Sequence, residues 1–233
     1  MRGEVEKEHP VYAGRDVAKE HPVYAGQAAY TRGLLRVYDT MVYRFNGPIL
    51  WRCPKSRFLD LYNANVSSTH LDIGVATGCL LDQCSFPVAA PQITLMDLNR
   101  NPLDKAAGRL MRYAPRTHQA NVLEPWGLAP ASYDSVGMAN VLHCLPGAMP
   151  AKTVAFEHAR TALVSGGVLF GATVLGEGVE HTRLSRTALK GMNRRGIFSN
   201  LNDSLEDLDA GLARVFSSHE IQVQGAVALF VAR

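Results

Sequence analysis

Short apolar runs alternate with longer amphipathic segments from residue 66 to the end of the chain. Runs of roughly four to eight mostly apolar residues, bounded by glycine, proline or polar residues, indicate buried strands. The predicted strands are residues 70–73, 93–97, 117–122, 133–140, 168–174, 220–224 and 226–231. Strands that alternate with helical segments predict an α/β fold with a mostly parallel sheet.

The segments between these strands have the pattern of helices. Residues 102–113 place four apolar side chains on one helical face: Leu103, Ala106, Ala107 and Leu110. Residues 150–163 form the next predicted helix, which the glycines of residues 164–167 end as a C-terminal cap. A capped helix start is predicted at residues 203–208, and the last two strands form a closing hairpin.

The chain before residue 66 has a different character. Residues 27–65 are predicted to be helical, with Pro54 in the first turn of a second helix. Residues 4–14 recur almost verbatim as residues 16–26, which predicts a duplicated and flexible tail over 1–26. Two copies are too few for a repeat architecture, and His9 and His21 have no third metal ligand near them in the sequence.

Composition narrows the functional classes. The chain of 233 residues is 47% hydrophobic and 19% charged, which suits one sizeable folded domain. The net charge is only +3 and the basic residues are scattered, so we expect no nucleic-acid partner. We also expect no membrane span and no secretory signal. The four cysteines lack zinc spacing, which predicts reduced thiols, a cytoplasmic location and no bound metal.

The most informative motif is the loop after the first strand of the predicted sheet. Asp72 ends the apolar run, and Gly74 and Gly78 follow before a short helical segment. Glycine allows a sharp turn and a close approach of the backbone to a ligand. A dinucleotide fingerprint would need glycine at Ala76 and Cys79 as well as at Gly74, so an NAD-linked reductase is disfavoured.

The pattern of Asp72, Gly74, Ala76 and Gly78 resembles the cofactor loop of class I S-adenosylmethionine-dependent methyltransferases, in which glycine is usual at Ala76. The order of the strands from residue 66 onward supports the resemblance. It implies a doubly wound seven-stranded sheet with an antiparallel last strand, a helical lid over residues 27–65 and a methyltransferase domain over residues 66–233. The implied cofactor is S-adenosylmethionine, with S-adenosylhomocysteine as product.

The same resemblance assigns the cofactor contacts. Asp97 closes the second strand, where a carboxylate accepts hydrogen bonds from ribose hydroxyls, and Leu98 follows it. Asn121 is placed to bond the adenine amine, with a turn role as the alternative. The expected ring cover is Val122 and Leu123, and Asn140 belongs to the methionine half of the site.

In methyl transfer, the main task of the protein is to align the acceptor atom with the methyl carbon of the cofactor and to exclude water. His143 is the expected general base, because histidine titrates near neutral pH, although a hydrogen bond to the backbone is an alternative role. An insert over residues 176–214 is predicted to cap the substrate. The predicted substrate contacts are Tyr38, Trp51, His181, Arg195 and Phe198.

These features predict methylation of an O, N or C atom of a small molecule, with natural-product tailoring as the setting and a monomer or homodimer as the assembly. Two alternatives stay open. The fold could bind the cofactor and catalyse other chemistry, such as cyclisation, or it could be a non-catalytic binding protein with a degenerate loop at Ala76.

Overall fold

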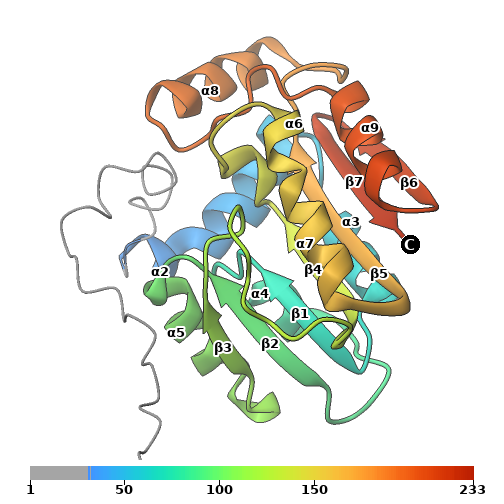
Figure 1. Cartoon of the computed structure of the whole chain (residues 1–233). Coiled ribbons are helices and arrows are strands. Elements are labelled where there is room, and N and C mark those ends of the chain that lie inside the picture. Colours follow the sequence, from blue (N-terminus) through green and yellow to red (C-terminus); the bar gives the residue numbers. More distant parts are fainter. Residues whose placement is uncertain (1–30, 32) are drawn as a thin grey trace, which may run out of the picture.

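The computed structural model describes residue 31 and residues 33–233. Its centre is a seven-stranded sheet in the order β3-β2-β1-β4-β5-β7-β6 (Figure 1). All strand pairings are parallel except those of β7, which runs antiparallel to both β5 and β6. The predicted fold class is confirmed. The strands are β1 (Thr69–Ile73), β2 (Gln92–Asp97), β3 (Arg116–Gln119), β4 (Tyr133–Ala139), β5 (Leu163–Val174), β6 (His219–Gln224) and β7 (Val227–Ala232).

The strand order reverses at β1, and this reversal positions the site. β1 pairs with β2 on one side and with β4 on the other. β1 ends at Ile73, β2 at Asp97 and β4 at Ala139. Because these strands are parallel, all three ends lie at the same edge of the sheet. In open α/β sheets, ligands bind in the crevice at the carboxyl end of such a switch point.

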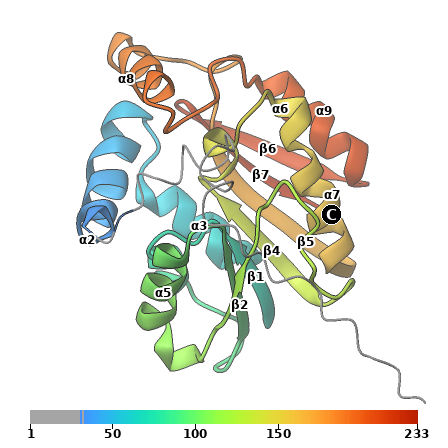
Figure 2. The same ribbon diagram turned by 60° about the vertical axis from the view of Figure 1, so that its left-hand side comes forward.

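Helices cover both faces of the sheet (Figure 2). On one face, apolar side chains pack beneath α3 (Lys55–Asn65), α4 (Cys79–Gln83) and α5 (Arg100–Arg109). The opposite face packs beneath α7 (Val154–Ala162) and α9 (Leu205–Val215), with the short α6 (Met149–Lys152) against α9. β7 contributes side chains to the cores on both faces of the sheet. Leu229 packs in the core beneath α3, α4 and α5, and Phe230 packs in the core beneath α7 and α9.

Some element boundaries predicted from the sequence are wrong. The helix of residues 102–113 begins at Arg100 and ends at Arg109, and a 3₁₀ turn, η3 (Met111–Tyr113), follows it. The helix of residues 150–163 is two helices, α6 and α7, and the third strand ends at Gln119 rather than at residue 122. Asn121 and Val122 therefore lie in the loop after β3.

The glycine pair after α7 is not a helix cap. α7 ends at Ala162, and Leu163 is already extended and pairs with Tyr133. The register of β4 against β5 then shifts between Tyr133 and Ser135. Gly166 adopts a φ of +75°, so this glycine accommodates an irregularity inside a strand instead of ending a helix.

The helical segment before α3 lies beside the sheet. α2 (Leu34–Asp39) continues into η2 (Thr40–Leu50), a π-helix that contains Pro48, and α3 follows with Pro54 as its N-cap. A π-helix inside helical structure often marks a functional site. The duplicated residues 1–26, with His9 and His21, lie outside the described residues.

The insert before the final hairpin carries α8 (Arg183–Arg194) and α9. Ser204 caps α9 as predicted, because its Oγ accepts a hydrogen bond of 3.0 Å from the amide of Asp207. A buried ion pair of 2.5 Å between Lys152 and Asp203 ties the loop before α9 to α6. Along the part of the chain that is described, no helix is long and apolar enough to cross a membrane.

Candidate functional site

The loop between β1 and α4 is shaped by backbone that favours glycine. Gly74 has a φ of +68°, and a Cβ placed on it would lie 2.3 Å from Cγ2 of Val141. Gly78 also has a positive φ, of +70°. Ala76 adopts a φ of +46°, which explains why glycine is favoured at this position. The loop therefore keeps the shape of a glycine turn at the cost of strain at Ala76.

One cavity lies directly over this loop, and we refer to it as the loop cavity. Its floor contains Gly74, Ala76 and Gly78, and Asn140 and Tyr38 lie at its other side. Asp72 also lines it, and its carboxylate accepts a hydrogen bond of 2.8 Å from the hydroxyl of Tyr62.

A second cavity, the strand-end cavity, lies between the ends of β1, β2 and β4. It shares Gly74 with the loop cavity and is lined also by Asp97, Leu98, Asn121 and Val122. Asp97 is only 7% exposed, and its Oδ1 accepts a hydrogen bond of 2.8 Å from the amide of Asn99. Burial raises the pKa of the Asp97 carboxyl to about 7.

The side chain of Asn121 forms a turn while it lines this cavity. Its Oδ1 accepts a hydrogen bond of 3.1 Å from the amide of Leu123, and its Nδ2 donates one of 2.9 Å to Glu124. Asn121 therefore both stabilises the turn and lines the strand-end cavity. Leu123 packs against the core on the α7 side of the sheet and is not part of the cavity lining.

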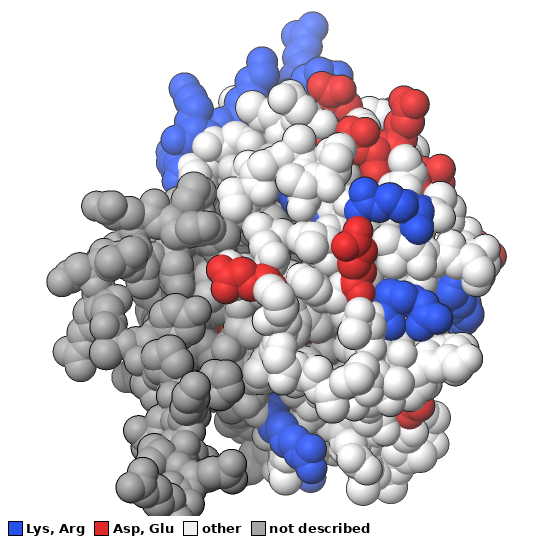
Figure 3. Space-filling model, in the orientation of Figure 1, with Lys and Arg blue, Asp and Glu red and all other residues white. Residues whose placement is uncertain are grey.

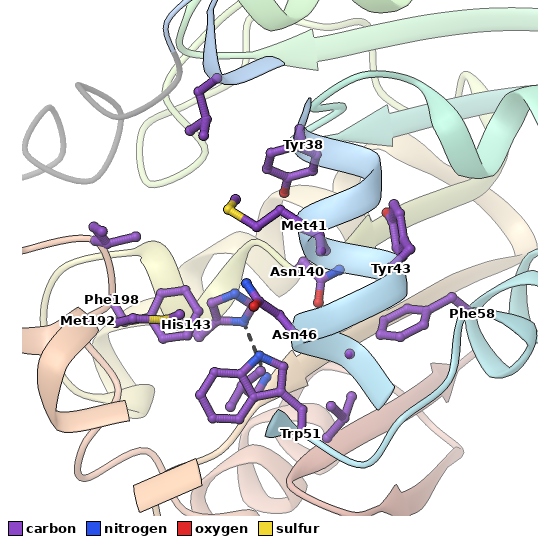
Figure 4. A pocket seen from close by; sticks show the side chains of 16 residues that line it. Tyr38, Met41, Tyr43, Asn46, Trp51, Phe58, Asn140, His143, Met192 and Phe198 are labelled. Atoms are coloured by element: carbon purple, nitrogen blue, oxygen red, sulfur yellow. Dashed lines mark hydrogen bonds between the residues drawn. The ribbon is translucent and has the colours of Figure 1, made fainter. Parts of the chain in front are cut away.

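A larger apolar cavity of about 230 Å³ lies beyond the loop cavity (Figure 4). Asn140 and Tyr38 line both cavities, so the two adjoin. Asn140 has a φ of +61°, a left-handed conformation that is uncommon outside glycine but that asparagine tolerates. We call this space the aromatic cavity. Its lining includes Tyr38, Met41, Tyr43, Asn46, Trp51, Phe58, His143, Met192, Ile197 and Phe198.

The aromatic cavity has walls from three distant parts of the chain. Figure 4 shows Tyr38 and Tyr43 on the N-terminal helices, and Met192 and Phe198 on the segment around α8. The third wall is His143, which lies on the 3₁₀ turn η4 (Leu142–Cys144) after β4. The ring centroid of Phe198 lies 4.3 Å from that of His143 and 6.0 Å from that of Trp51.

His143 is fixed by the backbone of β5. Its Nδ1 lies 3.2 Å from the amide nitrogen of Val174 and 3.3 Å from the hydroxyl of Thr173. The residue is 4% exposed. Burial, together with the positive charge of Lys152, lowers the pKa of His143 to about 3.

A polar cluster joins the N-terminal helices to the cofactor loop. The carboxylate of Asp39, at the end of α2, accepts hydrogen bonds from Thr77 of the loop and, at 2.7 Å, from Arg109 of α5. Arg109 also donates to Thr77 at 3.0 Å. Burial alone would raise the pKa of Asp39, but the hydrogen bonds from Thr77 and Arg109 outweigh it and lower that pKa. We refer to these three residues as the lid anchor.

The structure brings most of the predicted site residues together and leaves some outside. The predicted substrate contacts Tyr38, Trp51 and Phe198 line the aromatic cavity. His181 instead hydrogen-bonds the carbonyl of Leu175 at 2.9 Å beside the start of α8, and Arg195 is exposed. Neither of these two side chains is part of the cavity lining. Within the described residues, no cluster of three histidine, cysteine or acidic side chains is arranged to hold a metal.

Sequence reasoning missed residues that only the fold brings to the site. Asn46, Met192 and Ile197 carry no motif, and they reach the aromatic cavity because η2 and α8 pack around it. The pairing of Asp39 with Arg109 joins residues 70 positions apart. Nothing in the sequence indicated the hydrogen bond from Tyr62 to Asp72.

The donor set of the two smaller cavities fits S-adenosylmethionine. Asp97 is a buried carboxylate that forms no ion pair with any described residue, which suits the hydroxyls of a ribose. Gly74 lines both cavities, and a Cβ on it would overlap Val141, so only glycine allows the backbone to pass at the point that the two cavities share. An adenosine half over the strand ends and a methionine half over the loop match this arrangement. A switch-point sheet with such a loop defines a class I S-adenosylmethionine-dependent methyltransferase.

Comparison with known proteins agrees with this class. Residues 71–169 match the family described as a methyltransferase domain. Over 204 residues the chain is 43% identical to demethylluteothin O-methyltransferase of Streptomyces thioluteus, covering 88% of this chain and 89% of that protein. It is 37% identical over 207 residues to the physcion biosynthesis cluster O-methyltransferase of Aspergillus chevalieri, with coverage of 88% and 93%. The chain belongs to this methyltransferase family.

A solved structure shows the same fold at low sequence identity. The complex of DhpI with S-adenosylhomocysteine superposes with a TM-score of 0.62 at 16% identity, and the match covers 91% of this chain and 96% of that one. The likeness therefore extends well beyond residues 71–169.

Proposed function

We propose that this methyltransferase transfers the methyl group of S-adenosylmethionine to a hydroxyl oxygen of a small, mostly apolar natural-product intermediate with an aromatic or conjugated ring. The observation that carries the proposal is the aromatic cavity, which adjoins the loop cavity at Asn140. Its lining contains no lysine, arginine, aspartate or glutamate among the described residues.

The shape and chemistry of the cavity favour a flat acceptor. Apolar and aromatic side chains with a few polar groups are the usual lining of a small-molecule site. Tyr43, Trp51 and Phe198 offer ring faces and edges, and Asn46 and Asn140 offer hydrogen-bond groups. A volume of about 230 Å³ is small, so a protein or nucleic-acid segment is not the expected acceptor. The two similar enzymes named above are O-methyltransferases, which supports oxygen as the acceptor atom.

Each part of the site has a role in this proposal. Asp97 binds the ribose, Asn121, Val122 and Leu98 surround the adenine, and Gly74, Ala76 and Gly78 cradle the methionine half. Bound S-adenosylmethionine supplies an electrophilic methyl carbon. The protein aligns the acceptor oxygen with that carbon and keeps water out, which accounts for most of the rate enhancement such a reaction needs.

Two covers over the aromatic cavity complete the proposal. The N-terminal helices and the insert of residues 176–214 both contribute to the aromatic cavity, through Tyr38 and Phe198. We propose that they act as lid and substrate cap. The lid anchor would then couple closure of α2 to the cofactor loop, because Asp39 bonds Thr77 directly.

The proposal is tested with a matched pair of acceptors. The full chain is incubated with S-adenosylmethionine and either 1-naphthol or 1-aminonaphthalene, which differ only in the acceptor atom. We expect the methyl ether of naphthol and equivalent S-adenosylhomocysteine, with the product identified by mass spectrometry. The Phe198→Ala variant serves as the control for use of the cavity. Methylation of the amine in preference to the hydroxyl, or cofactor binding without turnover of any hydroxyl acceptor, would contradict the proposal.

A further inference from the structure

The hydrogen bonds of His143 determine where its proton lies. The backbone amide of Val174 can only donate, so Nδ1 of His143 must accept and carries no hydrogen (3.2 Å). A neutral imidazole has one N–H group, which must then be on Nε2. Thr173 can donate its hydroxyl hydrogen to the same Nδ1, so this contact agrees with the assignment.

The surroundings of His143 keep the ring neutral. The side chain is buried, and the titratable groups around it are Lys152 of α6 and the phenols of Tyr38 and Tyr43 across the cavity. Lys152 is itself paired with Asp203 at 2.5 Å. A positive neighbour and a low-dielectric environment both disfavour a second proton on the imidazole.

Of the residues that the structure describes in the cavity lining, none offers a carboxylate or an unprotonated imidazole nitrogen to the acceptor. Nδ1 of His143 is already bonded to Val174 and Thr173 of β5, so Nε2–H is the ring nitrogen left for a ligand in the aromatic cavity that His143 lines (Figure 4). Among the described lining residues, the only other side chains that titrate are Tyr38 and Tyr43. Burial raises the pKa of Tyr43 well above its ordinary value, so it stays protonated.

We propose that His143 is a hydrogen-bond donor to the acceptor oxygen, not a base, and that the enzyme binds its acceptor as a preformed oxyanion. This inference rests on the proposed O-methylation. It specifies the substrate class: an acidic hydroxyl, such as an enol or phenol conjugated to an electron-withdrawing group. The earlier expectation of a general base at His143 is replaced by a positioning and charge-stabilising contact from Nε2–H.

The reaction then balances without any proton transfer on the enzyme. A lone pair of the oxyanion forms the new O–C bond, the C–S bond breaks, and its electron pair stays on sulfur. The negative oxygen and the positive sulfonium both become neutral. Because charge disappears along this path, the apolar walls around Trp51 and Phe198 favour the reaction over the separated ions.

The outer face of α8 adds independent support for an anionic acceptor. Arg183, Arg186, Lys190 and Arg194 are exposed at helical spacing, and they form no ion pair with any described residue. Basic side chains gather over α8 in Figure 3. Met192, on the same helix, lines the aromatic cavity. A positive surface beside the cavity attracts anions to it.

The tautomer is measured directly on the full chain. Protein labelled with ¹⁵N-histidine and saturated with S-adenosylhomocysteine is recorded by long-range ¹H–¹⁵N NMR from pH 5 to pH 9, and the His143→Gln variant assigns the resonance. We expect an unprotonated Nδ1 and a protonated Nε2 whose shifts do not change over this range. The opposite tautomer, or a titration near neutral pH, would overturn the inference.

Kinetics provide the second test. We use 4-nitrophenol, 4-cyanophenol and 4-chlorophenol, whose acidity falls in that order, as acceptors. The midpoint of kcat/KM against pH should follow the acidity of each phenol. His143→Gln, which keeps an N–H donor, should retain kcat/KM to within about tenfold. His143→Leu should lose roughly a hundredfold in kcat/KM, mainly through a higher KM, because the bound oxyanion loses its hydrogen-bond donor. A common midpoint for all phenols, or equal losses in both variants, would contradict the inference.

The outcomes separate this inference from the proposed function. S-adenosylhomocysteine binding to each variant verifies that the fold is intact. If the wild-type chain methylates none of these hydroxyl compounds, nor 1-naphthol, the proposed oxygen acceptor fails. The NMR result still decides, on its own, whether His143 can act as a base.

Discussion

Replacing Asp97 with asparagine should stabilise the cofactor-free protein against unfolding. The same substitution should weaken binding of the cofactor. The carboxyl of Asp97 is 7% exposed, and burial raises its pKa from 3.8 to about 7. That difference is roughly three pKa units, each worth about 1.4 kcal/mol. Ionised Asp97 therefore costs the folded, cofactor-free chain about 4 kcal/mol at pH 8.

The sign follows from proton binding. The folded state keeps a proton on Asp97 that the unfolded chain loses between about pH 4 and the folded pKa of about 7. The free energy of unfolding therefore falls as pH rises through this window. Asparagine never ionises, and its carbonyl can still accept the hydrogen bond from the amide of Asn99. Asp97→Asn should therefore raise the free energy of unfolding at pH 8, where Asp97 is ionised, and raise it less at pH 5.

The assays are urea unfolding without cofactor at pH 5 and pH 8, and calorimetric titration with S-adenosylhomocysteine. We expect a gain in stability at pH 8 and a loss of roughly 1–3 kcal/mol in binding, because asparagine leaves ribose hydroxyls poorly paired. The control is Asp104→Asn, an exposed carboxylate paired with Arg100, which should change neither quantity. Lower stability at pH 8, or unchanged affinity, would refute the reasoning.

Further predictions concern the loop, the lid anchor and the aromatic cavity. Ala76→Gly should stabilise the chain by up to about 1 kcal/mol in urea unfolding, because relief of a left-handed alanine exceeds the extra chain entropy of glycine. A loss of stability would show that the loop is not strained there. Arg109→Met should raise hydrogen exchange over residues 34–39 and weaken cofactor binding about tenfold, since Asp39 loses a charged partner; Arg100→Met, which removes an exposed pair, is the control. Equal exchange in both variants would argue against the anchor. Phe198→Ala should raise the KM for 1-naphthol and leave S-adenosylhomocysteine affinity unchanged, and the reverse pattern would place the ring in the cofactor site.

Local signals in the sequence predicted the sheet and the cofactor side of the site. Strand ends with an acid or glycine, at Asp72, Gly74 and Asp97, can be recognised from a few neighbouring residues. Parallel strands bring such ends to one edge of a sheet, so the juxtaposition follows once the strand order is known. The residues predicted to contact the cofactor therefore line the loop cavity and the strand-end cavity, except Leu123, whereas other lining residues such as Val141 carry no local signal.

The acceptor side could not be predicted in the same way. Trp51, His143 and Phe198 meet because η2, η4 and the α8 region pack together, and no short-range pattern encodes that packing. The role of His143 depended on which atom lies opposite its Nδ1, and only the structure places Val174 there.

Local patterns gave a wrong prediction where the same residues can end a helix or lie within a strand. The glycines at Gly166 and Gly167 are typical of a helix end, but pairing of Leu163 with Tyr133 had already begun the strand. Tertiary pairing thus outweighed the local cap signal. His181 illustrates the same limit, because its position in the insert indicated substrate contact while its ring bonds the carbonyl of Leu175.

The most direct test of the account is calorimetric titration of the full chain with S-adenosylhomocysteine and, in parallel, with NADH. The loop over Gly74 and the carboxylate of Asp97 predict binding of S-adenosylhomocysteine in the micromolar range and no heat with NADH. Binding of NADH, or binding of neither compound, would contradict the assignment of these cavities to S-adenosylmethionine.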